Sequence, residues 1–324
     1  MTTPMRTLGR SGIQVSALGV GCWAMGGSGW GGGADDEQSI LGIRWALDNG
    51  VNFFDTADVY GDGHSELVLA EALGSNREKA IIATKFAHLK DPATGIQTGA
   101  DPKRIAQACE NSLKRLNTDY IDLYQFHWNE FPAEDAAPVR EALEGLVAAG
   151  KIRAYGWSTD FPDKARVFAQ GPHCTAIQVE LNVIDDAPDI LELCDEFNLA
   201  AINRGPLAMG LLTGKYKSNT TLPEDDVRGP NAPGWMKLFK SGKPNPEWLN
   251  KVEAISEILR SEGRSLAQGA LCWLKARSDK NIPIPGFRTL KQVQENCGAL
   301  RFDPLTADQM SEIDQILHRD RMAA

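Results

Sequence analysis

The chain has 324 residues, of which 42% are hydrophobic and 24% charged, a composition typical of globular proteins that bury a full core. Its net charge of -9 argues against a general binder of nucleic acid or acidic membranes, which needs a basic face. Residues 1–10 lack the apolar core of a signal peptide, and no stretch reaches the roughly 20 apolar residues of a membrane span, so we expect a cytoplasmic protein without a membrane partner.

Short apolar or β-branched runs alternate with amphipathic helical stretches along the chain. Predicted strands lie at 17–21, 51–55, 80–85, 120–127, 152–158, 176–180, 200–203 and 281–284. Predicted helices lie at 36–49, 64–74, 102–115, 136–149, 187–197, 265–277 and 289–299, with Ser39 or Asp101 as plausible starts. Eight strand–helix units favour a closed parallel barrel over an open sheet. The predicted fold class is therefore α/β, a (β/α)8 TIM barrel that forms a single domain over residues 1–324.

Three segments lie outside this repeat. Residues 5–16 read as a β-hairpin that plugs the floor of the barrel. Residues 216–247 form a long insertion after the seventh strand, rich in Pro, Gly, Asn and Lys, and we expect a lid on the substrate side. Residues 306–317 form an extra helix at the C-terminal end.

The six cysteines are scattered and include no C-x-x-C pair. With that spacing we expect neither a zinc site nor a disulfide framework, but buried thiols in a reducing compartment. No particular oligomeric state is indicated.

Ionisable residues stand where three consecutive predicted strands end. Asp55 follows the second strand, Lys85 the third and His127 the fourth, while Tyr60 lies in the loop just after Asp55. Because catalytic groups of such barrels come from the carboxyl ends of different strands, these four side chains are expected to meet at one mouth.

The chemistry of the four groups is complementary. A carbonyl that receives a hydride needs a proton on its oxygen, and a phenol with a pKa near 10 is a weak donor or acceptor for that at neutral pH. We expect Lys85 to lower the pKa of Tyr60, Asp55 to orient Lys85, and His127 to hydrogen-bond the substrate oxygen. The set includes no nucleophile and no arrangement typical of metal ligands, so it suits proton relay rather than hydrolysis.

In these motifs the chain resembles the aldo-keto reductases over essentially its full length. Residues 54–61, with Ser65 and Glu66 soon after, are similar to the active-site signature of that family. Lys85 and His127 fall at the other two positions of its catalytic tetrad, and residues 205–215 are similar to its loop over the cofactor pyrophosphate. The resemblance implies an oxidoreductase that reduces a small aldehyde or ketone with NADPH, with Tyr60 as proton donor.

The expected cofactor site follows from the same resemblance. No G-x-G-x-x-G opens a βαβ unit, so a Rossmann site is not supported. The resemblance implies that Ser158, Gln178 and Asn182 hold the carboxamide of nicotinamide at the barrel mouth. Backbone amides of the glycine-bearing loop are expected to contact the pyrophosphate. Further residues expected at the cofactor are Trp23, Arg204, Gly205, Pro206, Leu207, Gly210, Leu212 and Lys215.

The adenosine end is expected around residues 285–296. Thr289 fits the cap of a helix that starts at 290, with Arg288 beside the helix terminus and Gly286, Gln292 and Asn296 nearby. A helix N-terminus next to a guanidinium suits a ribose 2′-phosphate, which indicates NADPH rather than NADH.

One residue departs from the family pattern. Many relatives place an aromatic side chain before the Pro-Leu segment, where it stacks on nicotinamide, whereas this chain has Arg204. A guanidinium can stack on a flat ring but repels an oxidised, positively charged one. We therefore expect Arg204 to disfavour NADP⁺ and to bias the enzyme toward reduction.

Tryptophans dominate the loops expected at the active mouth. Trp23, Trp30 and Trp128 are predicted to line the substrate pocket, where aromatic walls suit aldehydes, keto-sugars and aryl ketones alike.

Three other functions stay open at this point. The first is an aldose or polyol dehydrogenase that works toward oxidation. The second is a cofactor-binding regulatory protein similar to the β-subunits of potassium channels, which share the barrel. The third is a hydrolase or aldolase that uses Lys85 as a Schiff base.

Overall fold

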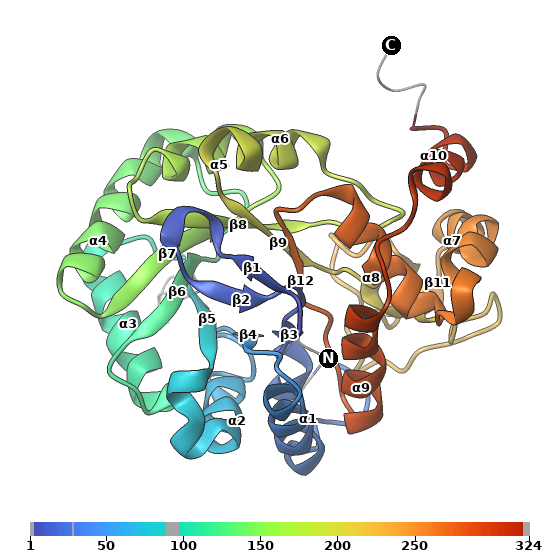
Figure 1. Cartoon of the computed structure of the whole chain (residues 1–324). Helices are drawn as coiled ribbons and strands as arrows, with labels where there is room; N and C mark the ends of the chain where they lie inside the picture. Colours follow the sequence, from blue (N-terminus) through green and yellow to red (C-terminus); the bar gives the residue numbers. More distant parts are fainter. Residues whose placement is uncertain (1–2, 28, 89–96, 320–324) are drawn as a thin grey trace.

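The computed structural model describes residues 3–27, 29–88 and 97–319, which form a parallel barrel ringed by helices (Figure 1). The strands are β3 (Val20–Gly21), β4 (Phe53–Asp55), β5 (Ile81–Phe86), β6 (Ile121–Phe126), β7 (Ile152–Ser158), β8 (Cys174–Glu180), β9 (Ala200–Arg204) and β12 (Asn281–Pro283). They pair in that order within one eight-stranded sheet. Gly19 N–H donates to the Pro283 carbonyl at 2.9 Å and Gly21 N–H to the Pro285 carbonyl at 3.1 Å, so the last strand meets the first. The predicted (β/α)8 barrel is confirmed.

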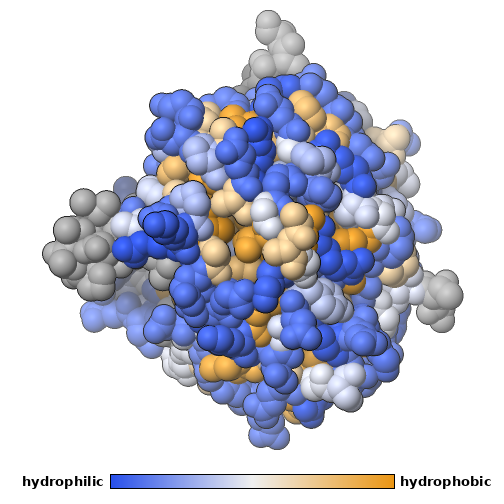
Figure 2. All heavy atoms as spheres, turned by 90° about the vertical axis from the view of Figure 1, so that its left-hand side faces the viewer, coloured by the Kyte–Doolittle hydropathy of each residue, from blue (hydrophilic) through white to orange (hydrophobic). Residues whose placement is uncertain are grey.

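The helices surround the sheet (Figure 1). They are α1 (Asp36–Asp48), α2 (His64–Leu73), α3 (Pro102–Leu116), α4 (Ala136–Ala148), α5 (Pro162–Ala169), α6 (Pro188–Phe197), α7 (Pro246–Arg260), α8 (Leu266–Arg277), α9 (Leu290–Gly298) and α10 (Ala307–Ile316). Figure 2 shows the side on which α3 and α4 lie, which is largely hydrophilic with small apolar patches. The predicted helices are confirmed, including the extra helix α10, but α5 and α7 were not predicted.

The beginnings of two helices test the capping expectations. Asp101 caps α3, because its carboxylate accepts the Lys103 N–H at 2.9 Å. Ser39 as a start is wrong, since Asp35 caps α1 by accepting the Gln38 N–H at 3.0 Å. Acidic residues in the first turn stabilise the positive end of the helix dipole and so extend α1 toward the N-terminus.

The N-terminal hairpin closes the bottom of the barrel. Strands β1 (Met5–Thr7) and β2 (Gln14–Ser16) pair antiparallel across this end (Figure 1). Leu8, Ile13 and Val15 are buried in one cluster with side chains that line the barrel interior. Those side chains are Phe53, Ala83, Leu123, Ala154, Ala176, Ala200, Ile202, Ile282 and Ile284. The predicted floor plug is confirmed.

The insertion at 216–247 is mostly turns, with one short hairpin of β10 (Phe239–Lys240) and β11 (Lys243–Pro244). Its centre is anchored by Arg228, which is 5% exposed and donates to both oxygens of Asp226. The same guanidinium lies 4.9 Å from the centre of the Trp30 ring. Val227 N–H donates to the Gly29 carbonyl at 2.7 Å, so the insertion packs against the loop after the first barrel strand.

Three further expectations concern disulfides, membrane-spanning helices and metal sites. All six cysteines are buried and free of disulfides. Among residues 3–27, 29–88 and 97–319, no helix has the length and apolar character of a membrane span, and no three His, Cys, Asp or Glu side chains gather as a metal site would require.

The floor plug makes a testable contribution to stability. Leu8 is fully buried, so Leu8→Ala is expected to lower the free energy of unfolding by about 2–5 kcal/mol through lost burial and a residual cavity. Met5→Ala in the same hairpin removes a side chain that is 46% exposed and serves as the control, with a change within about 0.5 kcal/mol. Urea denaturation measures both, and equal losses would contradict the role given to Leu8.

Candidate active site

The four side chains predicted from strand ends come together at the mouth of the barrel. Lys85 Nζ lies 2.5 Å from Asp55 Oδ1 and 3.2 Å from the Tyr60 hydroxyl. The ring of His127, which directly follows β6, lies edge-on to the Tyr60 ring with centres 6.1 Å apart. The parallel strands β4, β5 and β6 place these groups together because their carboxyl ends meet at one end of the barrel.

The ion pair between Lys85 and Asp55 is buried and fully engaged. Lys85 makes a third donation, to the Thr56 carbonyl at 2.8 Å. The second carboxylate oxygen of Asp55 accepts from Gln125 Nε2 at 2.9 Å and from Gln178 Nε2 at 2.8 Å. These contacts fix the carboxylate and so orient the ammonium toward Tyr60.

Gln125 was not among the predicted site residues. It is a buried polar side chain within the otherwise largely apolar strand β6, and it pairs across the sheet with Lys85. It stands two residues before His127, so alternation along the strand puts both side chains on the same face. That spacing is the signal in the sequence from which its place in the site could have been found.

The charge states of the tetrad follow from burial and from neighbouring groups. Burial raises the pKa of Tyr60 above 10.0, and Lys85 counteracts this only in part, so the expected lowering is outweighed. Burial lowers the pKa of Lys85, but Asp55 and Tyr60 together raise it by more, so the pKa lies above its usual value. Burial, with Lys85 as the next contribution, holds the pKa of His127 well below 6.5. The site therefore holds a protonated phenol, an ammonium and a neutral imidazole.

A close contact of two loops sets the position of Tyr60. Gly61 has φ +62°, and a Cβ there would lie 2.0 Å from the Gly26 carbonyl oxygen. Only glycine permits both the backbone angle and the approach. The contact brings Trp23 over Tyr60, with ring centres 6.0 Å apart and planes inclined by 26°.

The predicted aromatic pocket is brought together in part. Trp30 lies edge-on to Trp23, with ring centres 4.8 Å apart. The ring of Trp128 lies edge-on to that of Phe131, with ring centres 4.9 Å apart. Trp235, from the insertion, was missed, although it is 59% exposed and its ring centre lies 6.3 Å from that of Trp23.

The signature residues after Tyr60 support the site from behind. Glu66 is buried and accepts from the Thr84 hydroxyl and from Arg115 Nε, both at 2.6 Å. The Ser65 hydroxyl contacts Thr56 Oγ1 at 2.8 Å. These bonds tie α2 to β4 and β5, which carry Asp55 and Lys85.

The polar residues expected to hold a carboxamide lie at the mouth in different roles. Ser158 ends β7 and is buried. The amide nitrogen of Gln178 donates hydrogen bonds to Asp55 Oδ2 and, at 3.1 Å, to Gln125 Oε1, so this side chain helps to position Asp55. Asn182 donates to the Gly205 carbonyl at 3.2 Å and holds the loop after β9.

The segment expected over a pyrophosphate has the geometry of a cradle. Gly205 and Gly210 have φ values of +62° and +94°, and a Cβ at Gly210 would lie 3.4 Å from Lys215 Cε and 3.5 Å from Arg228 Nη1. Pro206, Leu207 and Leu212 are buried beneath the segment. A glycine-bearing loop beside Lys215 fits an anionic group, whereas Arg228 is buried and already paired with Asp226.

The expected phosphate site at α9 is engaged by protein groups. Arg288 donates to the carbonyls of Trp30 at 2.6 Å, Gly31 at 3.1 Å and Gly33 at 2.6 Å. It therefore ties the start of α9 to the loop after the first barrel strand.

Helix α9 begins at 290 as predicted, behind a reciprocal cap of Thr289 and Gln292. Gln292 Oε1 accepts the backbone N–H groups of Arg288 at 2.7 Å and Thr289 at 3.3 Å. Asn296 donates to the Gly286 carbonyl at 3.3 Å. Within the helix, the Leu290 N–H donates to Gln38 Oε1 at 3.2 Å and the Gln292 N–H to the Thr289 hydroxyl at 3.4 Å, while the phosphate site expected here stays a prediction.

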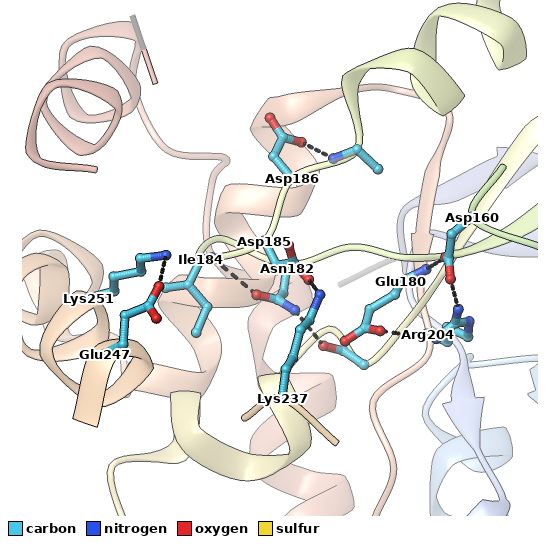
Figure 3. Close-up of polar contacts among 12 residues, drawn as sticks. Asp160, Glu180, Asn182, Ile184, Asp185, Asp186, Arg204, Lys237, Glu247 and Lys251 are labelled. Atoms are coloured by element: carbon cyan, nitrogen blue, oxygen red, sulfur yellow. Dashed lines mark hydrogen bonds and ion pairs between the residues drawn. The ribbon is translucent and has the colours of Figure 1, made fainter. Parts of the chain in front are cut away.

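Arg204 is held by two carboxylates (Figure 3). Its guanidinium pairs with Asp160, and with Glu180 Oε2 at 3.3 Å. The two carboxylates offset the charge of Arg204 on which the expected bias toward reduction rests, and the bias itself stays a prediction. Asp160 and Glu180 were not among the predicted site residues.

Comparison with known proteins agrees with this geometry. A model of the Aldo/keto reductase family matches residues 17–318. The chain belongs to this family. An aldo-keto reductase of Schizosaccharomyces pombe whose name specifies NADP(+) is 35% identical over 315 residues, which cover 93% of this chain and 88% of the relative.

Two solved structures share the barrel. A glycerol dehydrogenase from Gluconobacter oxydans superposes with a TM-score of 0.79 at 32% identity, covering 98% of this chain and 95% of the other. An aldo-keto reductase from Klebsiella pneumoniae in complex with NADPH superposes with a TM-score of 0.70 at 26% identity, covering 98% and 96%. Membership of the aldo/keto reductase family supports an oxidoreductase.

Proposed function

We propose that this aldo/keto reductase reduces a small aldehyde or ketone with NADPH, and that Tyr60 donates the proton. The observation that carries the proposal is the Tyr60 hydroxyl 3.2 Å from a fully buried Lys85 ammonium that is itself held by Asp55. A bound nicotinamide supplies the hydride. The residues of this chain bind the carbonyl, orient it and deliver the proton.

The proton transfer follows from the charge states. Tyr60, with a pKa raised by burial, carries its proton at neutral pH and gives it to the carbonyl oxygen as the carbon is reduced. The Lys85 ammonium then stabilises the phenolate at close range. His127, neutral because burial and Lys85 lower its pKa, orients the carbonyl without competing as a cationic acid.

The same geometry opposes a Schiff base on Lys85. That reaction needs a neutral, accessible amine, whereas Lys85 is fully buried and its pKa is raised by Asp55 and Tyr60 against the effect of burial. A purely regulatory protein similar to channel subunits does not require a proton-donating tetrad, so the presence of all four side chains favours an enzyme.

NADPH is proposed from the cations at the mouth and from the relatives. Lys215 lies beside Gly210, and Arg288 stands just before the start of α9. The relative from S. pombe carries NADP(+) in its name, and the structure from K. pneumoniae was solved with NADPH.

An oxidative enzyme acting on a polyol is the second candidate. Two observations favour it: the carboxylates around Arg204, which offset a charge unfavourable to NADP⁺, and the likeness to a glycerol dehydrogenase. Assays of alcohols with NADP⁺ and of carbonyls with NADPH separate the two directions.

Removing the Tyr60 hydroxyl tests the proton donor. Tyr60→Phe is expected to lower kcat for 4-nitrobenzaldehyde by about 10²–10⁴-fold, measured as NADPH oxidation, because the carbonyl oxygen loses its general acid. Tyr120→Phe, at the opposite end of the barrel before β6, is the matched control and should keep wild-type activity. Full activity in Tyr60→Phe would refute the proposal.

The pH profile tests the charge states. Reduction requires a protonated Tyr60, so kcat is expected to stay level from the ordinary histidine pKa of 6.5 to the ordinary tyrosine pKa of 10.0, and to fall only as pH rises through the raised pKa of Tyr60. The measurement is steady-state kcat at saturating NADPH and aldehyde. A midpoint near neutrality would mean that Lys85 outweighs burial.

Arg288 is tested with both cofactors. Arg288→Ala is expected to raise KM for NADPH about 10- to 100-fold and to leave KM for NADH nearly unchanged, because a charge-assisted contact to the 2′-phosphate is lost. Gln292→Ala loosens the same cap without removing a cation and should affect both cofactors alike. Equal effects of Arg288→Ala on both would assign Arg288 to holding residues 30–33 instead.

A further inference from the structure

A closed cluster of three charged side chains stands at the carboxyl ends of β7, β8 and β9, and we call Arg204, Asp160 and Glu180 the mouth trio (Figure 3). Arg204 and Glu180 end their strands as register partners. Asp160 also accepts the backbone N–H of Glu180 at 2.8 Å, and its own N–H donates to Asn129 Oδ1 at 2.9 Å. The trio is therefore positioned by backbone contacts as well as by its charges.

The trio has an uneven charge. Two carboxylates face one guanidinium, so the sum is one negative charge when all three are ionised. The nearby cation Lys237 of the insertion is itself paired with Asp185, as Figure 3 shows. The side chains of the trio are only 26–32% exposed, so water screens their charges in part.

The trio lies one layer above the tetrad. Gln178, which donates to Asp55, stands two residues before Glu180 in β8, so strand alternation points both side chains to the same face. Burial is the largest influence on the pKa values of Tyr60 and His127, and Arg204 is among the charges that lower both. Arg204, the cation of the trio, is therefore within electrostatic range of the reacting groups, and strand register places Glu180 beside it.

The hydride donor must lie close to Tyr60. A carbonyl oxygen that takes a proton from Tyr60 lies about 3 Å from its hydroxyl, and the donor carbon lies about 3–3.5 Å from the carbonyl carbon. A nicotinamide ring that lies on the side of β8 and β9 is near the trio, because Glu180 and Arg204 end these strands. The oxidised ring carries a positive charge and the reduced ring carries none, so the trio acts on one form and barely on the other.

We propose that Asp160 and Glu180 are specificity-determining residues, which give the mouth trio a net negative charge and thereby strengthen the binding of NADP⁺ relative to NADPH. This inference rests on the proposed function and adds which redox form the site favours through these side chains. The two carboxylates act through the ring's charge and need not touch the substrate.

The test is a series of variants ordered by charge. Glu180→Gln and Asp160→Asn each bring the trio to zero, and Arg204→Gln brings it to two negative charges. Dissociation constants of NADP⁺ and NADPH are measured by calorimetry and by NADPH fluorescence at low ionic strength, because salt screens partly exposed charges. Glu196→Gln, in an exposed pair with Arg166 near the end of α6, is the control.

We expect the ratio of Kd for NADP⁺ to Kd for NADPH to rise about tenfold in each neutralised variant and to fall in Arg204→Gln. A tenfold change in that ratio shifts the two-electron potential of the bound cofactor by about 30 mV. The control should leave the ratio at the wild-type value.

Two results would overturn the inference while leaving the proposed function intact. One is an unchanged ratio in all three variants. The other is a Kd ratio that shifts in the same direction for Glu180→Gln and Arg204→Gln. These variants change the charge of the trio in opposite directions, so a common shift would indicate a structural disturbance rather than a charge effect. Failure of the wild-type protein to bind either cofactor would instead overturn the proposed function and this inference together.

Discussion

The buried ion pair between Lys85 and Asp55 is the interaction on which the site depends. Taking an ammonium and a carboxylate out of water costs several kcal/mol per ion, and only close, well-satisfied geometry offsets this. The remaining hydrogen bonds come from the Thr56 carbonyl directly after β4, from Gln125 in β6 and from Gln178 in β8. The register of β4, β5, β6 and β8 is thus constrained by one charge pair at their ends.

Asp55, Lys85 and His127 could be predicted from the sequence because each marks a change from an apolar strand to an ionisable end, and Tyr60 because it lies in the loop just after Asp55. Gln125 carried a signal in its spacing from His127, whereas the part of Glu180 depends on which residues pair across the sheet, which one strand read alone does not reveal. The net pKa shift of Tyr60 was also beyond the sequence. It depends on how deeply the hydroxyl is buried against how closely Lys85 approaches, and burial outweighs the cation.

The fold was predictable to the extent that periodic patterns are long and regular. Helix α5 has only eight residues and three buried ones, too few for a clear period. Helix α7 does carry a regular spacing of Leu249, Val252, Ile255 and Leu259, but it follows directly on the turn-rich insertion, which hides its start. The charge of Arg204 was evident from the sequence but its surroundings were not, because the two carboxylates lie 24 and 44 residues away along the chain.

The floor plug also governs how protons reach the site. Directly below the tetrad, Ala83, Leu123 and Ala176 stand two residues before Lys85, Gln125 and Gln178, and Leu8, Ile13 and Val15 fill the space beneath them. A packed apolar interior offers a proton no hydrogen-bonded path. With Tyr60 as the proposed proton donor, each proton it gives away is replaced from the open mouth of the barrel, the same end at which substrate is proposed to bind.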